Sequence, residues 1–217
     1  MLVLLPPSEG KAQPDAGEPV DLGALTFAAE FREQREELLE ALDPGMRTAP
    51  AAPAAEIYTG VLFQRLGLPE LPEKARRRVL IASFLWGVVR PEDRIPYYKL
   101  PPKEKLKGIG PLAKFWRPAL AEALPDEEGD LIVDMRSGAY AAAWKPKQAT
   151  LLSLRAFTER DGERKAVSHM AKAVRGEVAG ALLRAKEPPM DPAAVAALAE
   201  SAGFTAELSD GSLDVIV

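Results

Sequence analysis

The segment Val79-Leu80-Ile81-Ala82-Ser83-Phe84 is a short, mostly apolar run, the pattern of a strand that is buried on both faces. Three similar runs lie at Leu2–Leu5, Leu131–Met135 and Ala149–Phe157. Strands of this kind belong to sheets whose faces are covered by other elements, usually helices. The sequence therefore predicts an α/β fold with a central sheet.

Two hairpins are expected to make this sheet mixed rather than purely parallel. Arg164–Ser168 is predicted to pair with Leu151–Phe157 through Asp161-Gly162, and Phe204–Leu208 with Leu213–Val217 through Asp210-Gly211. Helical patterns, several with a cap or a proline at the first position, cover Phe27–Leu42, Tyr58–Leu66, Pro111–Leu124, Gly138–Trp144, Met170–Ala185 and Pro192–Ala202. The Ala- and Pro-rich segment Pro44–Ala55 is predicted to be a loop.

The composition indicates one ordinary globular domain that spans residues 1–217. The chain has 217 residues with 47% hydrophobic and 28% charged content, and it shows no repeat or long linker. Zero cysteines exclude disulfides, thiolate nucleophiles and iron–sulfur ligation, and the single histidine makes a metal site or a metal cofactor unexpected. No signal peptide and no 18-residue apolar run is present, so a cytoplasmic protein without a membrane partner is expected.

Charge is distributed unevenly along the chain. Asp15 to Asp43 contains nine acidic residues against Arg32 and Arg35, whereas Lys99 to Arg117 contains six basic residues against Glu104. Arg164 to Lys186 has six basic residues against Glu177. One face is therefore expected to attract anions, although plain solvated surface charge explains the same pattern.

Polar groups follow each predicted strand, where α/β proteins usually bind ligands next to helix N-termini. These groups are expected to form an anion-binding crevice. They comprise Ser8, Glu9 and Lys11 after the first strand, Arg90 and Asp93 after the second, Asp134, Arg136 and Ser137 after the third, and His169, Lys172 and Arg175 after the hairpin.

Structural roles compete with each of these assignments. Ser8 and Glu9 could organise a turn, Arg90 could pair with Asp93, and Asp134 or Ser137 could cap the next helix. His169 is more often a structural histidine than a catalyst. Gly176 and Gly180 favour close packing or close approach of a ligand, and the sequence alone does not separate the two.

A second candidate element is Leu106-Lys107-Gly108-Ile109-Gly110-Pro111, which leads into a predicted helix. Its Gly-Ile-Gly turn is similar to the turn of helix-hairpin-helix motifs, which hold a DNA phosphate with backbone N–H groups. Gly108 and Gly110 let the backbone approach an oxygen atom, and the helix N-terminus supplies donors. Lys103, Lys105, Lys107 and Lys114 supply positive charge.

Several segments, in order along nearly the whole chain, resemble the YaaA family of bacterial peroxide-stress proteins. They are Ile57-Tyr58-Thr59-Gly60-Val61, Phe84-Leu85-Trp86-Gly87-Val88-Val89-Arg90-Pro91-Glu92-Asp93, Pro96-Tyr97-Tyr98-Lys99-Leu100, Phe115-Trp116 and Ala171-Lys172-Ala173-Val174-Arg175-Gly176. The family pattern Ser-Pro-Ala-Lys-Thr after the first strand differs from Pro7-Ser8-Glu9-Gly10-Lys11 here, so Lys11 is displaced.

The resemblance implies a cantaloupe-like fold and binding of double-stranded or structured DNA through a helix-hairpin-helix and a basic cleft. It also implies a role in limiting peroxide damage and free intracellular iron. With no cysteine, any protection by this chain is expected to be indirect. Tyr58 and Thr59 enter the candidate site through the matched Tyr-Thr-Gly segment.

Three functional hypotheses follow. The first is a DNA-binding stress protein whose lysines, with Lys172 and Arg175, track phosphates while Tyr97, Tyr98 and Trp116 give shape or stacking. The second is an enzyme acting on a nucleotide or nucleobase, with Lys11 as nucleophile, Glu9 or Asp134 moving protons, and Arg90, Arg136 and Arg175 holding phosphate. The third is a protein-interaction module that uses the acidic helix Glu30–Glu40.

Overall fold

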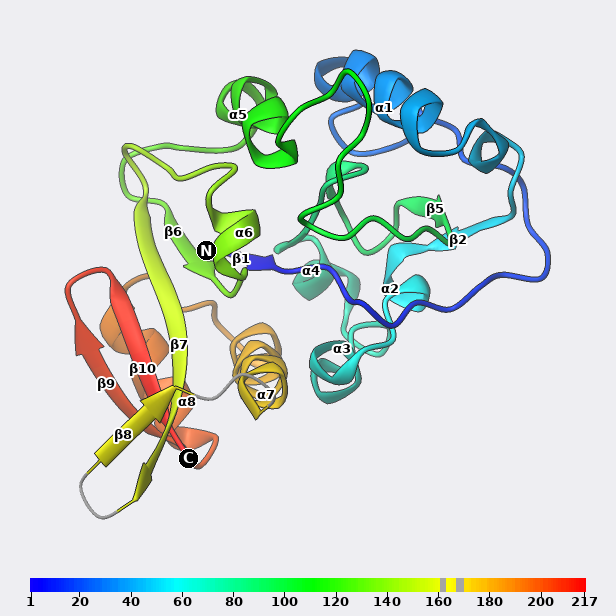
Figure 1. Cartoon of the computed structure of the whole chain (residues 1–217). Helices are drawn as coiled ribbons and strands as arrows, with labels where there is room; N and C mark the ends of the chain where they lie inside the picture. Colours follow the sequence, from blue (N-terminus) through cyan, green and yellow to red (C-terminus); the bar gives the residue numbers. More distant parts are fainter. Residues whose placement is uncertain (161–162, 167–169) are drawn as a thin grey trace.

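A computed structural model of the chain describes residues 1–160, 163–166 and 170–217. Its centre is an eight-stranded sheet in which seven strands follow the order β4-β3-β1-β6-β7-β10-β9 and β8 pairs with β7 (Figure 1). The strands of this sheet are β1 (Leu2–Leu5), β3 (Val79–Ser83), β4 (Gly87–Val89), β6 (Leu131–Asp134), β7 (Thr150–Arg160), β8 (Glu163–Ala166), β9 (Thr205–Ser209) and β10 (Ser212–Ile216).

The sheet is mixed, as the sequence predicts. β1 pairs in parallel with both β3 and β6, β6 with β7, and β7 with β10. The two predicted hairpins are confirmed as antiparallel pairs, β7 with β8 and β9 with β10. The Asp161-Gly162 turn lies outside the described residues. The four buried strands predicted from apolar runs are all present, and β7 is longer than predicted.

Both faces of the central sheet are covered. Every residue of β3 and β6 is buried, as expected for strands with helices packed on both sides. α7 packs on α3, on α8 and on β7, while α1 and α5 contact each other elsewhere (Figure 1). The helices are α1 (Ala28–Leu42), α2 (Ala54–Ile57), α3 (Val61–Leu66), α4 (Glu73–Arg76), α5 (Leu112–Ala123), α6 (Gly138–Ala141), α7 (Met170–Arg184) and α8 (Pro192–Ser201). Within the described part of the chain, none of them is long and apolar enough to cross a membrane.

The contact between α7 and α3 resolves the role of Gly176. A Cβ atom at this position would lie 2.3 Å from the carbonyl oxygen of Leu62 in α3. No side chain fits there, so glycine is needed for the close approach of two helix backbones. Gly176 thus serves packing rather than ligand binding.

The segment around Tyr58 differs from its prediction. The predicted helix Tyr58–Leu66 begins only at Val61, as α3, because Tyr58 has extended backbone (ψ 106°) and bridges to Lys11, while the short helix α2 ends before it at Ile57. The predicted loop Pro44–Ala55 contains a 3-10 helix, η1 (Pro44–Arg47), and a strand, β2 (Ala51–Pro53), which pairs with β5 (Arg94–Pro96). Both strands are only three residues long, too short for a periodic signal.

β4 is a further strand that the sequence analysis did not predict, and it changes the position of Arg90. β4 runs antiparallel to β3, with Ser83 opposite Gly87 and Ile81 opposite Val89. The chain therefore returns to the amino end of β3, where the Arg90 guanidinium donates to the carbonyl of Arg77. Arg90 was expected beside Lys11, and the structure places it at the opposite end of the sheet.

Arg35, on α1, holds the turn between β3 and β4. Its fully buried guanidinium donates to the carbonyls of Trp86 (3.1 Å), Val88 (3.2 Å) and Thr26 (2.7 Å). Burial lowers the pKa of Arg35 to about 10, against the opposing effect of Asp93. The turn is thereby tied to α1 by charge-assisted hydrogen bonds.

Gly87 is predicted to be a packing-critical position. It has a φ of +75°, and a Cβ atom there would lie 2.7 Å from the Trp116 ring. We expect Gly87→Ala to lower the free energy of unfolding by about 2 to 4 kcal/mol, because conformational strain adds to overpacking. Urea denaturation measures the loss.

Gly129 provides the matched control. Its φ is also positive, at +91°, but no atom lies within 4 Å of the added Cβ. Gly129→Ala should therefore cost only the conformational part, about 1 kcal/mol. Equal losses in the two variants would contradict a packing role for Gly87.

Candidate functional site

Three parallel strands, β1, β3 and β6, end at one edge of the sheet, and polar side chains gather there. β1 leads into Ser8 and Lys11, Ser83 ends β3, and Asp134 ends β6. Two groups of contacts result. We call Ser8, Lys11, Tyr58, Ser83 and Tyr98 the lysine–tyrosine cluster, and Asp134 with Arg136 the buried ion pair.

The loop that carries Lys11 is fixed by the segment around Gly60. The Ser8 hydroxyl accepts a 2.8 Å hydrogen bond from the Gly60 amide, and a Cβ atom on Gly60 would lie 2.2 Å from that oxygen. Two backbone hydrogen bonds, from Ala12 to Ile57 and from Thr59 to Gly10, extend the contact. The Tyr-Thr-Gly segment therefore positions the loop, although the Thr59 side chain itself is exposed.

Lys11 lies partly buried against two tyrosine rings. Its Nζ donates to the Ser8 carbonyl at 2.6 Å and lies 4.5 Å from the Tyr98 ring centroid and 5.8 Å from that of Tyr58. Burial lowers the pKa of Lys11 to about 8, and the charge of Glu9 opposes this effect. Roughly a tenth of Lys11 is then neutral amine at pH 7, far more than for a free lysine.

A chain of buried hydroxyls lies behind the lysine. The Ser83 and Tyr98 hydroxyls are 2.8 Å apart, and those of Tyr98 and Tyr58 are also 2.8 Å apart. Ser83 Oγ accepts from the amides of Leu85 (3.2 Å) and Trp86 (3.1 Å), so its own proton points to Tyr98. The proton of Tyr98 then points to Tyr58. Burial raises the pKa of both tyrosines, that of Tyr98 to about 12, so both stay neutral.

Asp134 and Arg136 form a buried ion pair with little capacity for a ligand. Asp134 Oδ1 accepts from the backbone amide and Nε of Arg136 at 2.9 and 2.8 Å, and Oδ2 accepts from Nη2 at 2.8 Å. Arg136 also donates to the carbonyls of Trp144 (2.9 Å) and Tyr140 (3.4 Å). The pair holds α6 and the residues after it against the sheet end, which favours a structural role over proton transfer or phosphate binding. Ser137, at the N-cap of α6, is exposed and makes no side-chain capping bond.

α7 carries two basic side chains, Lys172 and Arg175, to the edge of the sheet where β1 and β6 end. Lys172 Nζ is 3.7 Å from Glu9 Oε2, and both side chains are exposed. Burial lowers the pKa of the half-buried Arg175, while the charge of Asp134 opposes that effect. These residues, with Lys11, are the members of the expected crevice that the structure brings together. His169 lies outside the described residues.

The residues Lys99 to Lys114, which we call the lysine loop, form a separate basic surface. Lys103, Lys105, Lys107 and Lys114 are all exposed. Gly108 and Gly110 have φ values of +88° and +73°, and a turn is closed by a 3.2 Å hydrogen bond from Ile109 N to Leu106 O.

The element around this turn differs from a helix-hairpin-helix. α5 follows the turn, but residues 97–110 contain no helix before it. The adjacent prolines Pro101 and Pro102 lack amide hydrogens and disfavour a helix there. Trp116 was expected to contact DNA, yet it is fully buried and donates to the Phe84 carbonyl at 2.8 Å.

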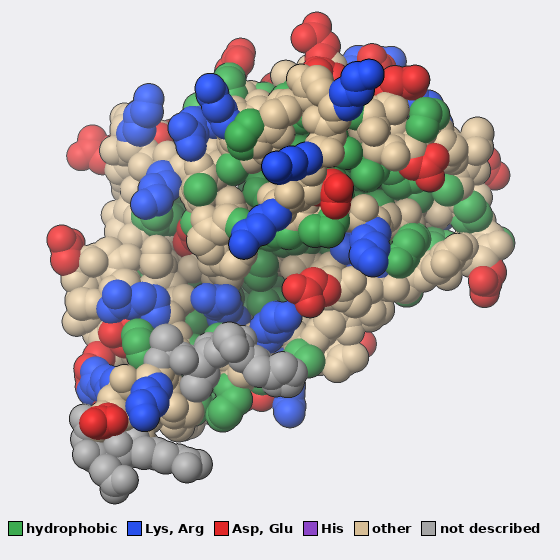
Figure 2. Space-filling model, in the orientation of Figure 1, with side chains coloured by type: hydrophobic (Ala, Val, Ile, Leu, Met, Phe, Trp, Pro, Cys, Tyr) green, Lys and Arg blue, Asp and Glu red, His purple; other side chains and the backbone are tan. Residues whose placement is uncertain are grey.

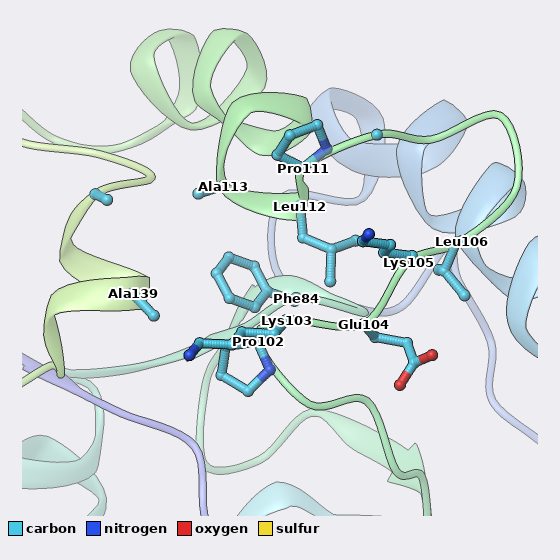
Figure 3. A pocket seen from close by; sticks show the side chains of 12 residues that line it. Phe84, Pro102, Lys103, Glu104, Lys105, Leu106, Pro111, Leu112, Ala113 and Ala139 are labelled. Carbon is cyan, nitrogen blue, oxygen red and sulfur yellow. The ribbon is translucent and has the colours of Figure 1, made fainter.

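A cavity of about 590 Å³ lies beneath the lysine loop (Figure 3). Phe84, Pro102, Leu106 and Leu112 line it, together with Ala139 and Ala142 beside the buried ion pair. Phe84 also stacks on Tyr140, with ring centroids 4.3 Å apart. No local sequence pattern indicates this cavity, because residues far apart in the chain form it.

The hydroxyl chain was also missed, although one signal for it exists in the sequence. Ser83 is a polar residue near the carboxyl end of an otherwise apolar strand. Tyr98 was expected to stack on DNA, but it is buried and hydrogen-bonded. Among the described residues, no group of three or more potential metal-ligating side chains is placed to hold a metal ion.

The Lys11 ammonium is predicted to titrate near pH 8, well below the value of about 10.4 for a free lysine. NMR of the dimethylated lysines across pH 6 to 11 measures this pKa. Because the Glu9 charge raises the pKa, we expect Glu9→Gln to lower it further. An ordinary lysine pKa, or a rise in the Glu9→Gln variant, would contradict the burial of Lys11.

Comparison with known proteins identifies the family of this chain. The family model described as "Peroxide stress protein YaaA" matches residues 28–207. A UPF0246 protein of Streptomyces coelicolor is 40% identical over the whole chain and 98% of its own length. UPF0246 proteins of Corynebacterium efficiens and Corynebacterium glutamicum are 35% and 34% identical, over 98% and 95% of their lengths. The chain therefore belongs to the YaaA family of peroxide stress proteins.

Proposed function

We propose that this protein binds duplex or structured DNA through the lysine loop and thereby limits oxidative DNA damage during peroxide stress. The observation that carries the proposal is the exposed, uncompensated charge of this loop. The lysine loop holds five exposed lysines and one acidic residue, Glu104. None of its five lysines forms an ion pair with another described residue.

Unpaired surface lysines suit a polyanion, because binding to phosphates releases counterions without breaking ion pairs in the protein. On the face shown in Figure 2, Lys and Arg side chains are spread around an area of exposed hydrophobic side chains, with a few acidic side chains among them. Asp and Glu side chains gather at the edge near α1. A phosphate backbone would therefore lie across the basic area rather than along α1.

The backbone after the lysines adds hydrogen-bond donors for a phosphate. Gly108 and Gly110 leave open space around their Cα atoms, so an oxygen can approach closely. The first amides of α5, at Leu112 and Ala113, precede the first amide that is bonded within the helix, that of Lys114. Donors of this kind contact phosphates and make no contact with the bases. We therefore expect the protein to distinguish DNA molecules by their shape rather than by their base sequence.

A charge-reversal experiment tests the lysine loop. We expect Lys107→Glu with Lys114→Glu to weaken binding of a labelled duplex at least tenfold at low salt. The slope of log affinity against log salt should fall by about 2. Fluorescence anisotropy measures both quantities across a salt series with a duplex and a four-way junction.

Lys74→Glu is the matched control, because Lys74 is an exposed lysine on α4. It should leave affinity and slope nearly unchanged. Absence of binding to both DNA forms at low salt would rule out the proposed function, and equal effects of both charge reversals would rule out the loop as its site. A role in limiting free iron remains a prediction from the family.

A second candidate function, an enzyme acting on a nucleotide or nucleobase, is favoured by one observation. Lys11 combines a lowered pKa with a position at the strand ends, the property of a nucleophilic amine. A neutral amine adds to the aldehyde of an abasic sugar and loses water to give an imine, which borohydride reduces to a stable amine. Glu9 is the exposed carboxylate nearest to this lysine in sequence.

Trapping with borohydride tests this candidate. We expect a covalent adduct with abasic DNA whose yield rises with pH toward and above 8, as Lys11 loses its proton. Lys11→Arg should give no adduct. Lys172→Arg is the control, because Lys172 is an exposed lysine that also lies beside Glu9, and it should leave the yield unchanged. An equal yield from Lys11→Arg would exclude Lys11 as the nucleophile.

A further inference from the structure

The cavity beneath the lysine loop is not explained by phosphate binding. Its volume of about 590 Å³ falls within the range of small-molecule sites, and most of its lining is apolar. Phosphates need only the exposed lysines and backbone amides, whereas an apolar cavity removes carbon-rich groups from water. The cavity therefore fits the uncharged part of a ligand whose anionic part lies on the loop.

The cavity has a flat aromatic wall that is held in place. The Phe84 ring stacks on Tyr140 at an interplanar angle of 22°, so its orientation is fixed from behind. Leu112 and Pro102 lie on either side of this ring in the close view, with Ala139 beyond it (Figure 3). Phe84 is only 3% exposed, so a guest contacts a small part of this ring and gains mainly by burying its own apolar area among Phe84, Leu112 and Pro102.

The polar groups of the cavity match an anionic ligand with hydrogen-bond donors. Lys103 and Lys105 line different sides of the cavity and are exposed to solvent, so either of them can hold a phosphate at its opening (Figure 3). Glu104, between them in sequence, also lines the cavity, and its carboxylate points away from Phe84, so it can accept from an amino group at the rim (Figure 3). A plain fatty acyl chain would leave this acceptor unused.

We propose that this cavity binds a single unstacked nucleobase, with the phosphate of the same nucleotide on Lys103 or Lys105. The base comes from a free nucleotide or from a position where it has left the DNA helix. Only the second source rests on the proposed DNA-binding function. Turning a base out costs least where it is mismatched or damaged, so the second source predicts preference for such sites.

The test uses Ala139, an exposed residue on the cavity wall. Ala139→Phe places a ring in the cavity without disturbing a buried position, and Ala193→Phe makes the same change at an exposed position on α8. Isothermal titration calorimetry with AMP, GMP, CMP and UMP measures the first source. Ribose 5-phosphate and inorganic phosphate serve as ligands that lack a base.

The second source is measured with two duplexes that differ at one position. One contains 2-aminopurine opposite an abasic site, and the other contains the same base fully paired. We expect at least a fivefold preference for the unpaired base in the unmodified protein and in Ala193→Phe. Ala139→Phe should lose this preference and weaken mononucleotide binding at least tenfold, while its affinity for the paired duplex stays within twofold.

The outcomes separate this inference from the proposed function. Mononucleotide binding that is lost in Ala139→Phe, without any duplex binding, supports the cavity and overturns the DNA proposal. Duplex binding without base preference, and with no mononucleotide binding, overturns the cavity proposal alone. Equal binding of ribose 5-phosphate and AMP, or unchanged binding by Ala139→Phe, also overturns it.

Discussion

The parallel pairing of β1 with both β3 and β6 is the constraint on which the candidate site depends. This pairing brings the ends of three strands to one edge, although Leu5, Ser83 and Asp134 are far apart in sequence. The three strands are almost entirely buried, so their register is set by core packing. The polar residues that follow these strands are held in place by them, because buried central strands are the most rigid part of the fold.

The buried ion pair shows how such an edge can be polar without being reactive. Two charges in the interior must be well matched to offset their loss of hydration, and Arg136 meets this need with one carboxylate and two carbonyls. Removing either partner would leave the other buried and uncompensated. Lys11 differs, because it has a carbonyl and two aromatic rings as neighbours and no carboxylate at ion-pair distance among the described residues. The same sheet edge therefore carries one pair that stabilises the fold and one amine that remains available.

Most of the sheet could be predicted from the sequence, since β1, β3, β6 and β7 are apolar runs and both hairpins have turn residues. β4 could not be predicted in this way, because its three residues follow β3 without any polar break. That omission placed Arg90 at the wrong end of the sheet. Of the candidate site, contacts join Ser8 to Lys11 and Glu9 to Lys172, and Asp134 is close enough to Arg175 for its charge to act there. Tyr98, Ser83 and Phe84 were not assigned their roles, because these depend on contacts between distant segments that no local pattern records.

The acidic surface of α1 has a consequence for the kinetics of association. Glu30, Glu33, Glu37 and Glu40 are exposed on a helix that packs against α5, which begins at the end of the lysine loop. Opposite charges on neighbouring elements give the protein a dipole, so a polyanion that diffuses toward it experiences a torque before any contact forms. For the DNA partner proposed above, encounters would thereby be selected by orientation, and the association rate would depend on ionic strength more steeply than the net charge of -4 implies.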